Sequence, residues 1–347
     1  MKADIICFTA RGLIMANRIR RAAGSETGVY YKFKGENAEG CGCGKYVTEP
    51  LTEWATERFK TETPLVFIGA CGIAVRSIAP SVHDKFKDIP VVVMDEAGRH
   101  VIPILSAHYG GAGELAAEIA EITHAEMVIT TATDVNELFA IDLFARKNNL
   151  TISSKEGVKK VSGRILSGDT LTFRVEGGKT GSGFPDELKM VKKGDSDIFI
   201  SPYRDKREGN YIVKLVPKVV YAGIGCVRGK AKEDIEELFD KTFEGLGLEK
   251  SSIKGIATLD FKADENGLRE FARERDYSFQ TFSSEILKKI KGNFTASAFV
   301  AKTVGIDNVC ERACMAAAGN GAVLICRKKA WNGVTVAFAM SKWSVVF

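Results

Sequence analysis

The chain has 347 residues, of which 45% are hydrophobic and 27% are charged, and Lys plus Arg exceed Asp plus Glu by 49 to 44. This length predicts two or three domains, and the composition excludes disordered and collagen-like chains. The formal net charge of +5 is spread along the sequence, so we expect no nucleic-acid partner. No apolar run reaches the roughly 20 residues of a membrane span, and residues 1–9 lack signal-peptide character, which predicts a cytoplasmic protein without a membrane partner.

Residues 1–139 alternate strand-like and helical patterns. Apolar runs typical of strands occupy residues 5–8, 65–68, 91–94 and 127–130, and a helical pattern covers residues 115–122. This alternation predicts an N-terminal α/β domain with a largely parallel sheet. Ligands of such folds bind in a crevice outside the carboxyl ends of the strands. The glycines that follow strand-like runs are therefore candidates for that crevice: Gly69, Gly72, Gly110, Gly111 and Gly113.

The pattern changes twice along the rest of the chain. Residues 140–217 are polar and rich in Lys and Gly, with short apolar runs such as 171–175, and predict a small middle domain. Residues 218–347 form the third predicted domain, with strands at 219–222, 253–258, 323–326 and 334–339 and helices at 231–243, 265–273, 284–291 and 309–318. We therefore predict a multi-domain α/β protein in which N-terminal, middle and C-terminal domains are each α/β.

The eight cysteines are dispersed, which indicates free thiols rather than a disulfide framework. Cys41 and Cys43 share a Gly-rich stretch, and Cys310 and Cys314 share a predicted helix face. Either pair is a candidate for a metal site, but neither has a matching pair or a nearby His, and zinc usually takes four ligands. We favour an unligated role for both pairs and expect no metal site.

Ordered segments at both ends of the chain carry a family resemblance. In the N-terminal domain they are residues 69–76 with Asp84, Lys85 and Asp88, residues 93–96, residues 106–112 and residues 130–134. In the C-terminal domain they are residues 223–226, 259–262, 264–265, 282–283, 304–305, 310–313 and 333–337. Together they resemble the cobalt-precorrin-5A hydrolases of anaerobic cobalamin biosynthesis, the CbiG family. The chain departs from the family pattern at Cys71, Ala107 and Gly113, which bears on the hydrogen bonds expected around His108.

The resemblance implies an enzyme that opens the δ-lactone of a cobalt-containing tetrapyrrole and releases acetaldehyde to give cobalt-precorrin-5B. It implies no cofactor held by the protein, since the cobalt is part of the substrate. The implied partner is this small molecule, and a homodimer or an assembly with other enzymes of the pathway is left open. The alternative function is a non-catalytic tetrapyrrole carrier or scaffold. A nucleotide-binding regulator ranks last, because Gly223, Gly225 and Gly229 resemble an anion cradle without the dinucleotide spacing.

Lactone hydrolysis requires a base for the attacking water and hydrogen-bond donors for the oxyanion. His108 is our candidate base, because an imidazole exchanges a proton near neutral pH. Gly110 and Gly111 allow backbone N–H groups to approach the oxyanion. Asp95 or Glu96 is expected to act as a base or to orient His108. In the alternative, His108 only bonds neighbouring turns and the two acidic residues cap turns.

Other residues are candidates for binding the carboxylates and the ring of the substrate. Arg76 and Lys85 are expected to anchor carboxylates, since Arg can form two parallel hydrogen bonds with one. Further candidates are Gly69, Gly72, Thr130, Thr131, Asp134, Gly223, Gly225, Lys262, Glu265 and Glu311.

Each of these candidates has a structural alternative. Lys85 can instead form a solvated charge cluster with Asp84 and Asp88, and Asp134 can cap a helix. The alternative for the charged C-terminal candidates is a solvated surface position: Asp260, Lys262, Glu265 and Glu311. Because ligand sites favour domain interfaces, we expect the site between the first and third domains.

Overall fold

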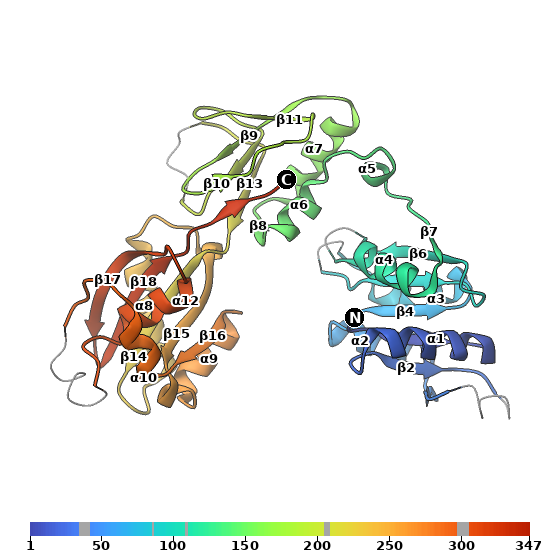
Figure 1. Ribbon diagram of the computed structural model, residues 1–347, viewed down its shortest axis with the longest axis horizontal. Coiled ribbons are helices and arrows are strands. Elements are labelled where there is room, and N and C mark those ends of the chain that lie inside the picture. Colours follow the sequence, from blue (N-terminus) through green and yellow to red (C-terminus); the bar gives the residue numbers. More distant parts are fainter. Residues whose placement is uncertain (35–41, 85–86, 108–109, 205–208, 297–304) are drawn as a thin grey trace. The chain divides into compact units, whose positions relative to one another are not determined.

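The computed structural model describes residues 1–34, 42–84, 87–107, 110–204, 209–296 and 305–347. They form two compact units, Met1–Leu143 and Phe144–Phe347, in which helices alternate with mixed sheets (Figure 1). The predicted α/β class is therefore confirmed, whereas the domain boundaries at 139/140 and 217/218 stay predictions. Among these residues, no helix combines the length and the apolar character needed to cross a membrane.

Seven strands of the described residues form the sheet of the first unit, here called the first sheet. They are β1 (Asp4–Cys7), β2 (Gly28–Tyr31), β3 (Lys45–Tyr46), β4 (Leu65–Ile68), β5 (Val91–Met94), β6 (His100–Leu105) and β7 (Glu126–Met127), in the spatial order β3-β2-β1-β4-β5-β6-β7. The strands from β3 to β5 are parallel. β6 runs antiparallel to β5, and β7 is parallel to β6. The sheet is thus largely parallel, as predicted, with a reversal at β6.

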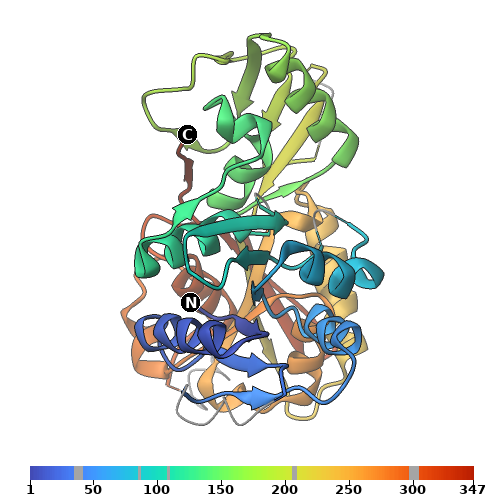
Figure 2. The same cartoon turned by 90° about the vertical axis from the view of Figure 1, so that its right-hand side faces the viewer.

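Helices cover both faces of the first sheet (Figure 2). α1 (Ala10–Ala23) and α4 (Ala112–Thr123) pack on one face, and α2 (Leu51–Lys60) and α3 (Cys71–Ile78) pack on the other. Val66 and Ile68 of β4 face the first helix pair, whereas Leu65 and Phe67 face the second. Because both faces are buried, the central strands consist of continuous apolar runs, and this is why their bounds were predictable.

The second unit begins with a sheet built from residues 150–217, here called the middle sheet. Its strands are β8 (Leu150–Ile152), β9 (Leu171–Val175), β11 (Leu188–Met190), β12 (Ile198–Ile200) and β13 (Val213–Pro217), in the order β11-β9-β12-β13-β8. α7 (Lys155–Leu166) packs on β9 and β13. The short strand β19 (Ser344–Val345) pairs with β10 (Lys179–Thr180), so the last residues of the chain lie beside this region.

A second sheet of this unit, the C-terminal sheet, has the order β16-β15-β14-β18-β17. Its strands are β14 (Val220–Cys226), β15 (Ile253–Leu259), β16 (Ser278–Phe282), β17 (Val323–Trp331) and β18 (Val334–Met340). β14, β15 and β16 are parallel, and the hairpin β17–β18 packs beside β14 with β18 antiparallel to it. Asn332 and Gly333 turn the hairpin with positive φ angles of 45° and 74°, which an Asn-Gly pair adopts readily.

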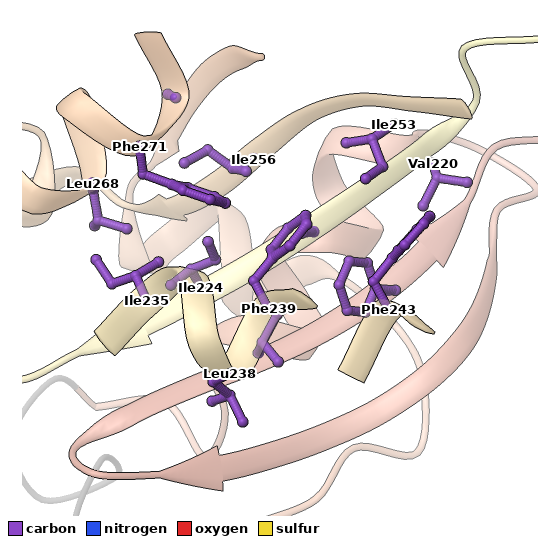
Figure 3. Packing of buried hydrophobic residues seen from close by; sticks show 14 of the residues in the cluster. Val220, Ile224, Ile235, Leu238, Phe239, Phe243, Ile253, Ile256, Leu268 and Phe271 are labelled. Atoms are coloured by element: carbon purple, nitrogen blue, oxygen red, sulfur yellow. The ribbon is translucent and has the colours of Figure 1, made fainter. Parts of the chain in front are cut away.

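Helices also cover both faces of the C-terminal sheet. α8 (Lys232–Glu244) and α9 (Asn266–Glu274) lie on one face, where Phe239 contacts Phe271 and Phe338 with ring centroids 5.0 and 5.1 Å apart (Figure 3). α12 (Cys310–Ala318) lies on the other face, against β14 and β18. The remaining helices of the described residues are α5 (Ala132–Val135), α6 (Ile141–Lys147), α10 (Ser284–Lys289) and the 3-10 turns η2 (Ala79–Ser81), η3 (Lys250–Ser252) and η4 (Asp260–Lys262).

Candidate functional site

Five predicted site residues lie at the edge of the first sheet where β1, β4 and β5 end, here called the carboxyl edge: Gly69, Gly72, Arg76, Asp95 and Glu96. The N–H of Gly69 donates to the carbonyl of Met94 at 2.8 Å, so the turn after β4 is joined to the end of β5. The order of the parallel strands reverses between β1 and β4. This edge is therefore the crevice that such folds use for ligands.

Glu96 and Arg76 present a carboxylate and a guanidinium at the carboxyl edge. The hydroxyl of Thr9 donates to the Glu96 carboxylate at 2.8 Å and accepts the N–H of Gly12 at the start of α1. The exposed Arg76 donates to the carbonyl of Gly72, one turn earlier in α3, at 3.1 Å. Arg76 makes no ion pair within the part of the chain that the structure describes. It thus retains the capacity to bind an anion.

Asp95 holds the turn between β5 and β6. Its carboxylate accepts backbone N–H groups of Ala97, Arg99 and His100 at 2.8, 2.9 and 2.7 Å. Partial burial acts to raise the pKa of Asp95, but the bonds from His100, Ala97 and Arg99 outweigh it, so the pKa lies below its ordinary value. This geometry favours the turn-capping alternative over a role as base.

The loop that precedes α4 lies at the opposite, amino edge of the first sheet. Leu105 at the end of β6 pairs with Val91 at the start of β5, and the Ser106 hydroxyl donates to the carbonyl of Asp88 at 2.7 Å. At about 3.3 Å per residue, β5 alone separates the two edges by roughly 10 Å. Gly110 and Gly111 are therefore not in the crevice of Gly69 and Gly72, contrary to the expectation of one shared crevice. The physical reason is the reversed direction of β6.

His108 and Lys85 lie outside the described residues, but their neighbours show how the amino edge is built. Asp88 is buried, and its carboxylate accepts the N–H groups of His83 and Asp84 at 3.0 to 3.2 Å. Asp88 therefore closes a turn, and the alternative in which it belongs to a solvated charge cluster is wrong for this residue. Gly111 has a φ of 92° and precedes the first residue of α4.

The segment with Thr130, Thr131 and Asp134 leaves the first sheet toward the amino edge, because β7 runs parallel to β6. The predicted strand at 127–130 ends at Met127. α5 begins at Ala132 after Thr131, so Asp134 lies inside the helix and does not cap it. Thr130 is exposed, and Thr131 is partly exposed. Both hydroxyl-bearing residues are thus accessible to solvent.

A cavity of about 730 Å³ opens at the carboxyl ends of β14 and β15 in the second unit, here called the C-terminal cavity. Its walls come from the ends of these strands, from η4, from the start of α12 and from the β17–β18 hairpin. Ligand sites of proteins usually occupy about 300 to 1,000 Å³. The C-terminal cavity is therefore large enough for a ligand or for a substantial part of one.

Large apolar side chains line this cavity and are also open to solvent. Phe261 is 61% exposed, Trp331 42% and Val227 53%. Aromatic residues rarely remain so exposed without a function, because hiding them from water is favourable. Their rings offer flat surfaces for a planar apolar ligand.

Three basic side chains also line the C-terminal cavity. Lys262 pairs with Glu265 at 2.8 Å. Arg228 and Lys328 make no ion pair within the described residues. Arg and Lys bind carboxylates through charge-assisted hydrogen bonds. Sequence reasoning missed Arg228 and Lys328; the position of Arg228 soon after the end of a buried strand is the one signal for it.

The three glycines of the predicted anion cradle have different roles. Gly225 lines the C-terminal cavity. Gly223 lies under α12, where a Cβ atom would collide with the backbone carbonyl of Cys310. The N–H of Gly229 donates to Glu265 at 2.9 Å and is not free for an anion. The three glycines therefore do not form an anion cradle; of the two predicted to bind substrate, Gly223 is a packing residue and Gly225 retains its place in a candidate site.

Glu311 is fully buried, which contradicts both its predicted contact with substrate and the solvated alternative. Its carboxylate accepts the N–H and the hydroxyl of Thr295 at 2.7 and 2.8 Å and the N–H of Lys328 at 2.7 Å. Because a buried carboxylate is stable only when it is well hydrogen-bonded, Glu311 joins α12 to two segments of the second unit. It supports the cavity wall at Lys328 rather than facing the cavity. Lys262 lines the cavity, whereas Asp260 is exposed beside it.

Two thiols, those of Cys226 and Cys310, line the C-terminal cavity. Burial raises the pKa of Cys310 to about 12 and also raises the pKa of Cys226. Both therefore stay protonated at neutral pH and are poor nucleophiles. Cys314 and Cys310 both belong to α12 and are buried where it packs on β14 and β18, while Cys41 lies outside the described residues. Within the described ranges, no group of three or more His, Cys, Asp or Glu is arranged to hold a metal ion.

Comparison with known proteins finds matches at both ends of the chain. Residues 53–134 match the family model "Cobalamin synthesis G N-terminal", and residues 220–339 match "Cobalamin synthesis G C-terminus". The cobalt-precorrin-5A hydrolase of Salmonella typhimurium is 39% identical over 266 residues, which cover 74% of this chain and 76% of that protein. The protein of the same name from Priestia megaterium is 33% identical over 299 residues, which cover 81% of this chain and 79% of the relative. The resemblance inferred from the ordered segments is thereby confirmed: this chain belongs to the cobalamin synthesis G (CbiG) family.

Proposed function

We propose that the chain is a cobalt-precorrin-5A hydrolase, which opens the δ-lactone of its substrate and releases acetaldehyde to give cobalt-precorrin-5B. Family membership supports the reaction class, since both relatives named above carry this activity in their names. The observation that carries the proposal is the C-terminal cavity, in which exposed aromatic rings and unpaired cations occur together within the described residues. This combination suits a flat apolar macrocycle with carboxylate arms.

The substrate would be held by two kinds of contact. The macrocycle lies against Phe261 and Trp331, because stacking on aromatic faces removes apolar surface of both partners from water. Its carboxylates bind Arg228 and Lys328, which form no ion pair with the described acidic residues. The proposal assigns no cofactor to the protein, because the cobalt enters with the substrate.

The reaction consists of two balanced steps. In the first, water loses a proton to a base and attacks the lactone carbonyl; the acyl C–O bond breaks, which leaves a carboxylate and a hydroxyl on the two-carbon unit. In the second, this hydroxyl loses its proton and its oxygen forms a C=O bond. The C–C bond to the macrocycle breaks at the same time, and its electron pair enters the conjugated ring. Acetaldehyde leaves, and no oxidant or reductant is needed.

The catalytic assignments are part of the proposal. His108 is the proposed base, and the N–H groups of Gly110 and Gly111 are the proposed oxyanion donors. Glu96 is the second candidate for the base, since its carboxylate is exposed and keeps free acceptor positions beside its bond to Thr9. Arg76 and Lys85 remain proposed carboxylate anchors.

Incubation of the purified chain with cobalt-precorrin-5A tests the activity. Mass spectrometry should follow the conversion of the macrocycle to a product that has gained water and lost the two-carbon unit, and an aldehyde-trapping reagent should capture acetaldehyde in equal amount. A variant with both Arg228→Gln and Lys328→Gln serves as the matched control and should turn over more slowly at low substrate concentration. Tight binding of the macrocycle by the unmodified chain without any aldehyde would favour the carrier alternative.

A further inference from the structure

A second hollow of about 490 Å³ adjoins the C-terminal cavity and is here called the α8 groove. It lies between the C-terminal half of α8, with the residues that follow it, and the edge strand β17. Ala330 and Trp331 of β17 line both the α8 groove and the C-terminal cavity. The two hollows therefore meet at the end of the β17–β18 hairpin, where the Trp331 side chain is partly exposed.

The register of β17 explains how the hairpin supplies charges to both hollows. Cys326 pairs with Phe338 and Lys329 pairs with Val336, so β17 has one residue more than β18 over this stretch and forms a β-bulge. Phe338 and Val336 pack against the core beneath α8, and residues paired across two strands share a face of the sheet. Lys329 therefore lines the α8 groove, whereas its neighbour Lys328 lines the C-terminal cavity.

Two cations of the α8 groove have no acidic partner. Lys329 from β17 and Lys241 from α8 are exposed and form no ion pair within the described residues. Glu237 is the acidic member of the described lining, so two positive charges face one negative charge. The Thr242 hydroxyl already donates to the carbonyl of Leu238 at 2.7 Å. The two ammonium groups are thus available to an anionic ligand.

The size of the C-terminal cavity leaves work for the α8 groove. Pockets of about 300 to 1,000 Å³ hold drug-sized ligands, and a tetrapyrrole with several carboxylate arms is larger than these. A cavity of about 730 Å³ therefore holds the ring but not every arm. Arms of a ring that stacks on Trp331 project past the indole toward the α8 groove. There Leu238 and Leu246 offer apolar contacts for methylene groups, and the lysines offer charge for a terminal carboxylate.

We propose that the α8 groove binds one carboxylate-bearing arm of the macrocycle, with Lys241 and Lys329 as its anchors and Trp331 as the wall shared with the ring. The identity of the ligand as a macrocyclic polycarboxylate rests on the proposed function. Lys241 and Lys329 are then specificity-determining residues. A macrocycle that lacks a carboxylate at this position loses their contribution, although Arg228 and Lys328 still attract its other arms.

The double variant Lys241→Gln/Lys329→Gln tests this assignment, because it removes both charges and nearly preserves side-chain size. Lys254→Gln/Arg327→Gln is the matched control: both residues are exposed, form no ion pair in the described chain and line neither hollow. Calorimetry measures affinity and stoichiometry for uroporphyrin III, which carries carboxylates around its whole edge, and for deuteroporphyrin IX, which carries them on one side only. The steady-state KM for cobalt-precorrin-5A is measured in parallel.

The two double variants should differ although they lose the same charge. Lys241→Gln/Lys329→Gln should bind uroporphyrin III about tenfold more weakly at low salt and raise the KM by a similar factor, whereas the control should change either value by less than about twofold. High salt should reduce the difference. Deuteroporphyrin IX should bind both double variants about equally, since its carboxylates can pair with Arg228 and Lys328 and leave the groove empty.

A change of opposite sign is expected at the acidic residue of the groove. Glu237→Gln should bind uroporphyrin III about threefold more tightly, because it removes a like charge beside the bound carboxylate. The melting temperatures of all these variants should stay close to that of the unmodified chain, since every substituted side chain is exposed.

Equal losses of affinity in the two double variants would overturn the assignment, because only the overall charge would then matter. Equal losses for the two porphyrins would overturn it as well, and so would a second bound uroporphyrin that Lys241→Gln/Lys329→Gln alone abolishes, since the groove would then be an independent site. Absence of porphyrin binding by the unmodified chain has the same consequence. Failure of the proposed function looks different: no acetaldehyde is released, yet porphyrin affinity still depends on Lys241 and Lys329.

Discussion

The first sheet and the C-terminal sheet both place polar residues at the ends of parallel strands, but the partners of those residues differ. In the first sheet, Asp95 and Asp88 direct their carboxylates at backbone N–H groups and close turns. In the C-terminal sheet, Arg228 and Lys328 line an apolar cavity without an acidic partner in the described chain. A polar residue after a strand is therefore a good candidate for ligand binding when the fold leaves its atoms unused.

The two sheets also differ in which edge the chain reaches through their antiparallel strand pairs, β5–β6 in the first sheet and β17–β18 in the C-terminal sheet. In the first sheet, the chain crosses from the carboxyl edge to the amino edge through β6, where Ser106 follows and where α4 begins. In the C-terminal sheet, the chain arrives through β17 and turns at Asn332 and Gly333 beside the end of β14. The hairpin can therefore form a wall of the cavity, whereas the loop after β6 cannot join the crevice of Gly69.

The largest expected effect distinguishes the two edges of the first sheet. His108→Gln, which tests the base proposed beside Gly110 and Gly111 in the sequence, should lower turnover of cobalt-precorrin-5A by about 10²- to 10⁴-fold if His108 is the base. Glu96→Gln is the matched variant at the carboxyl edge, where an amide oxygen can still accept the Thr9 hydroxyl, and it should have a much smaller effect. Single-turnover kinetics by mass spectrometry measures both. Normal turnover in His108→Gln with loss in Glu96→Gln would move the base to the carboxyl edge.

The next effect concerns the two glycines of β14. Gly223→Ala places a methyl group against the backbone of α12 and should lower the free energy of unfolding by about 3 kcal/mol, since tight packing tolerates added atoms poorly. In Gly225→Ala the added methyl group would lie 2.8 Å from the Thr335 hydroxyl alone, and that hydroxyl can rotate away. This substitution should therefore lower the free energy of unfolding by only about 1 kcal/mol. Urea denaturation measures both variants. Equal losses would contradict the distinction between a packing glycine and a cavity glycine.

A third, smaller effect is the difference in KM between variants of the cations that form no ion pair at the C-terminal cavity and a variant of the paired Lys262. Arg228→Gln and Lys328→Gln should each raise the KM for cobalt-precorrin-5A about tenfold, with little change in kcat. Lys262→Gln should raise it less, because Glu265 already balances much of the Lys262 charge. The differences should shrink in high salt, which screens exposed charges. An equal rise in all three variants would show that the pairing of Lys262 does not matter for binding.

The sequence predicts most elements of the fold because their burial leaves a pattern. The strands at 65–68 and 91–94 have the predicted bounds, since both faces of the first sheet are covered and every residue is apolar. β17 was predicted to end at Cys326 but continues to Trp331. Its charged residues Arg327, Lys328 and Lys329 conceal the strand, and they are tolerated because β17 is an edge strand.

The candidate site is less predictable, for two physical reasons. Apolar periodicity does not reveal whether a strand runs parallel or antiparallel, so Gly110 and Gly111 were assigned to the wrong edge of the first sheet. Periodicity also does not reveal which polar atoms find partners. Glu311 and Thr258 both belong to apolar stretches of the C-terminal domain, but one is fully hydrogen-bonded and the other is not. That distinction depends on contacts between segments far apart in the sequence.

The smallest expected effect concerns an ion pair that joins α8 to the end of α9 in the second unit. Arg275 donates to both oxygens of Asp240 at 2.8 and 2.7 Å, and these bonds lower the pKa of the Asp240 carboxyl. Because the folded pKa lies below the unfolded value of about 3.9, the stabilisation is present above about pH 4 and is lost as the pH falls through the folded pKa.

Asp240→Asn should therefore lower the free energy of unfolding by about 1 kcal/mol at pH 7, since both side chains remain partly in contact with solvent. Near pH 3 the difference from the unmodified chain should diminish, because the unfolded chain, with its pKa of about 3.9, binds a proton at this carboxyl there more readily than the folded chain does. Urea denaturation at the two pH values measures this. Asp264→Asn is the control, since Asp264 is 98% exposed and lies 3.6 Å from Arg269. A stability loss in Asp240→Asn that is the same at both pH values would mean that packing, and not the charge of the carboxylate, accounts for the effect.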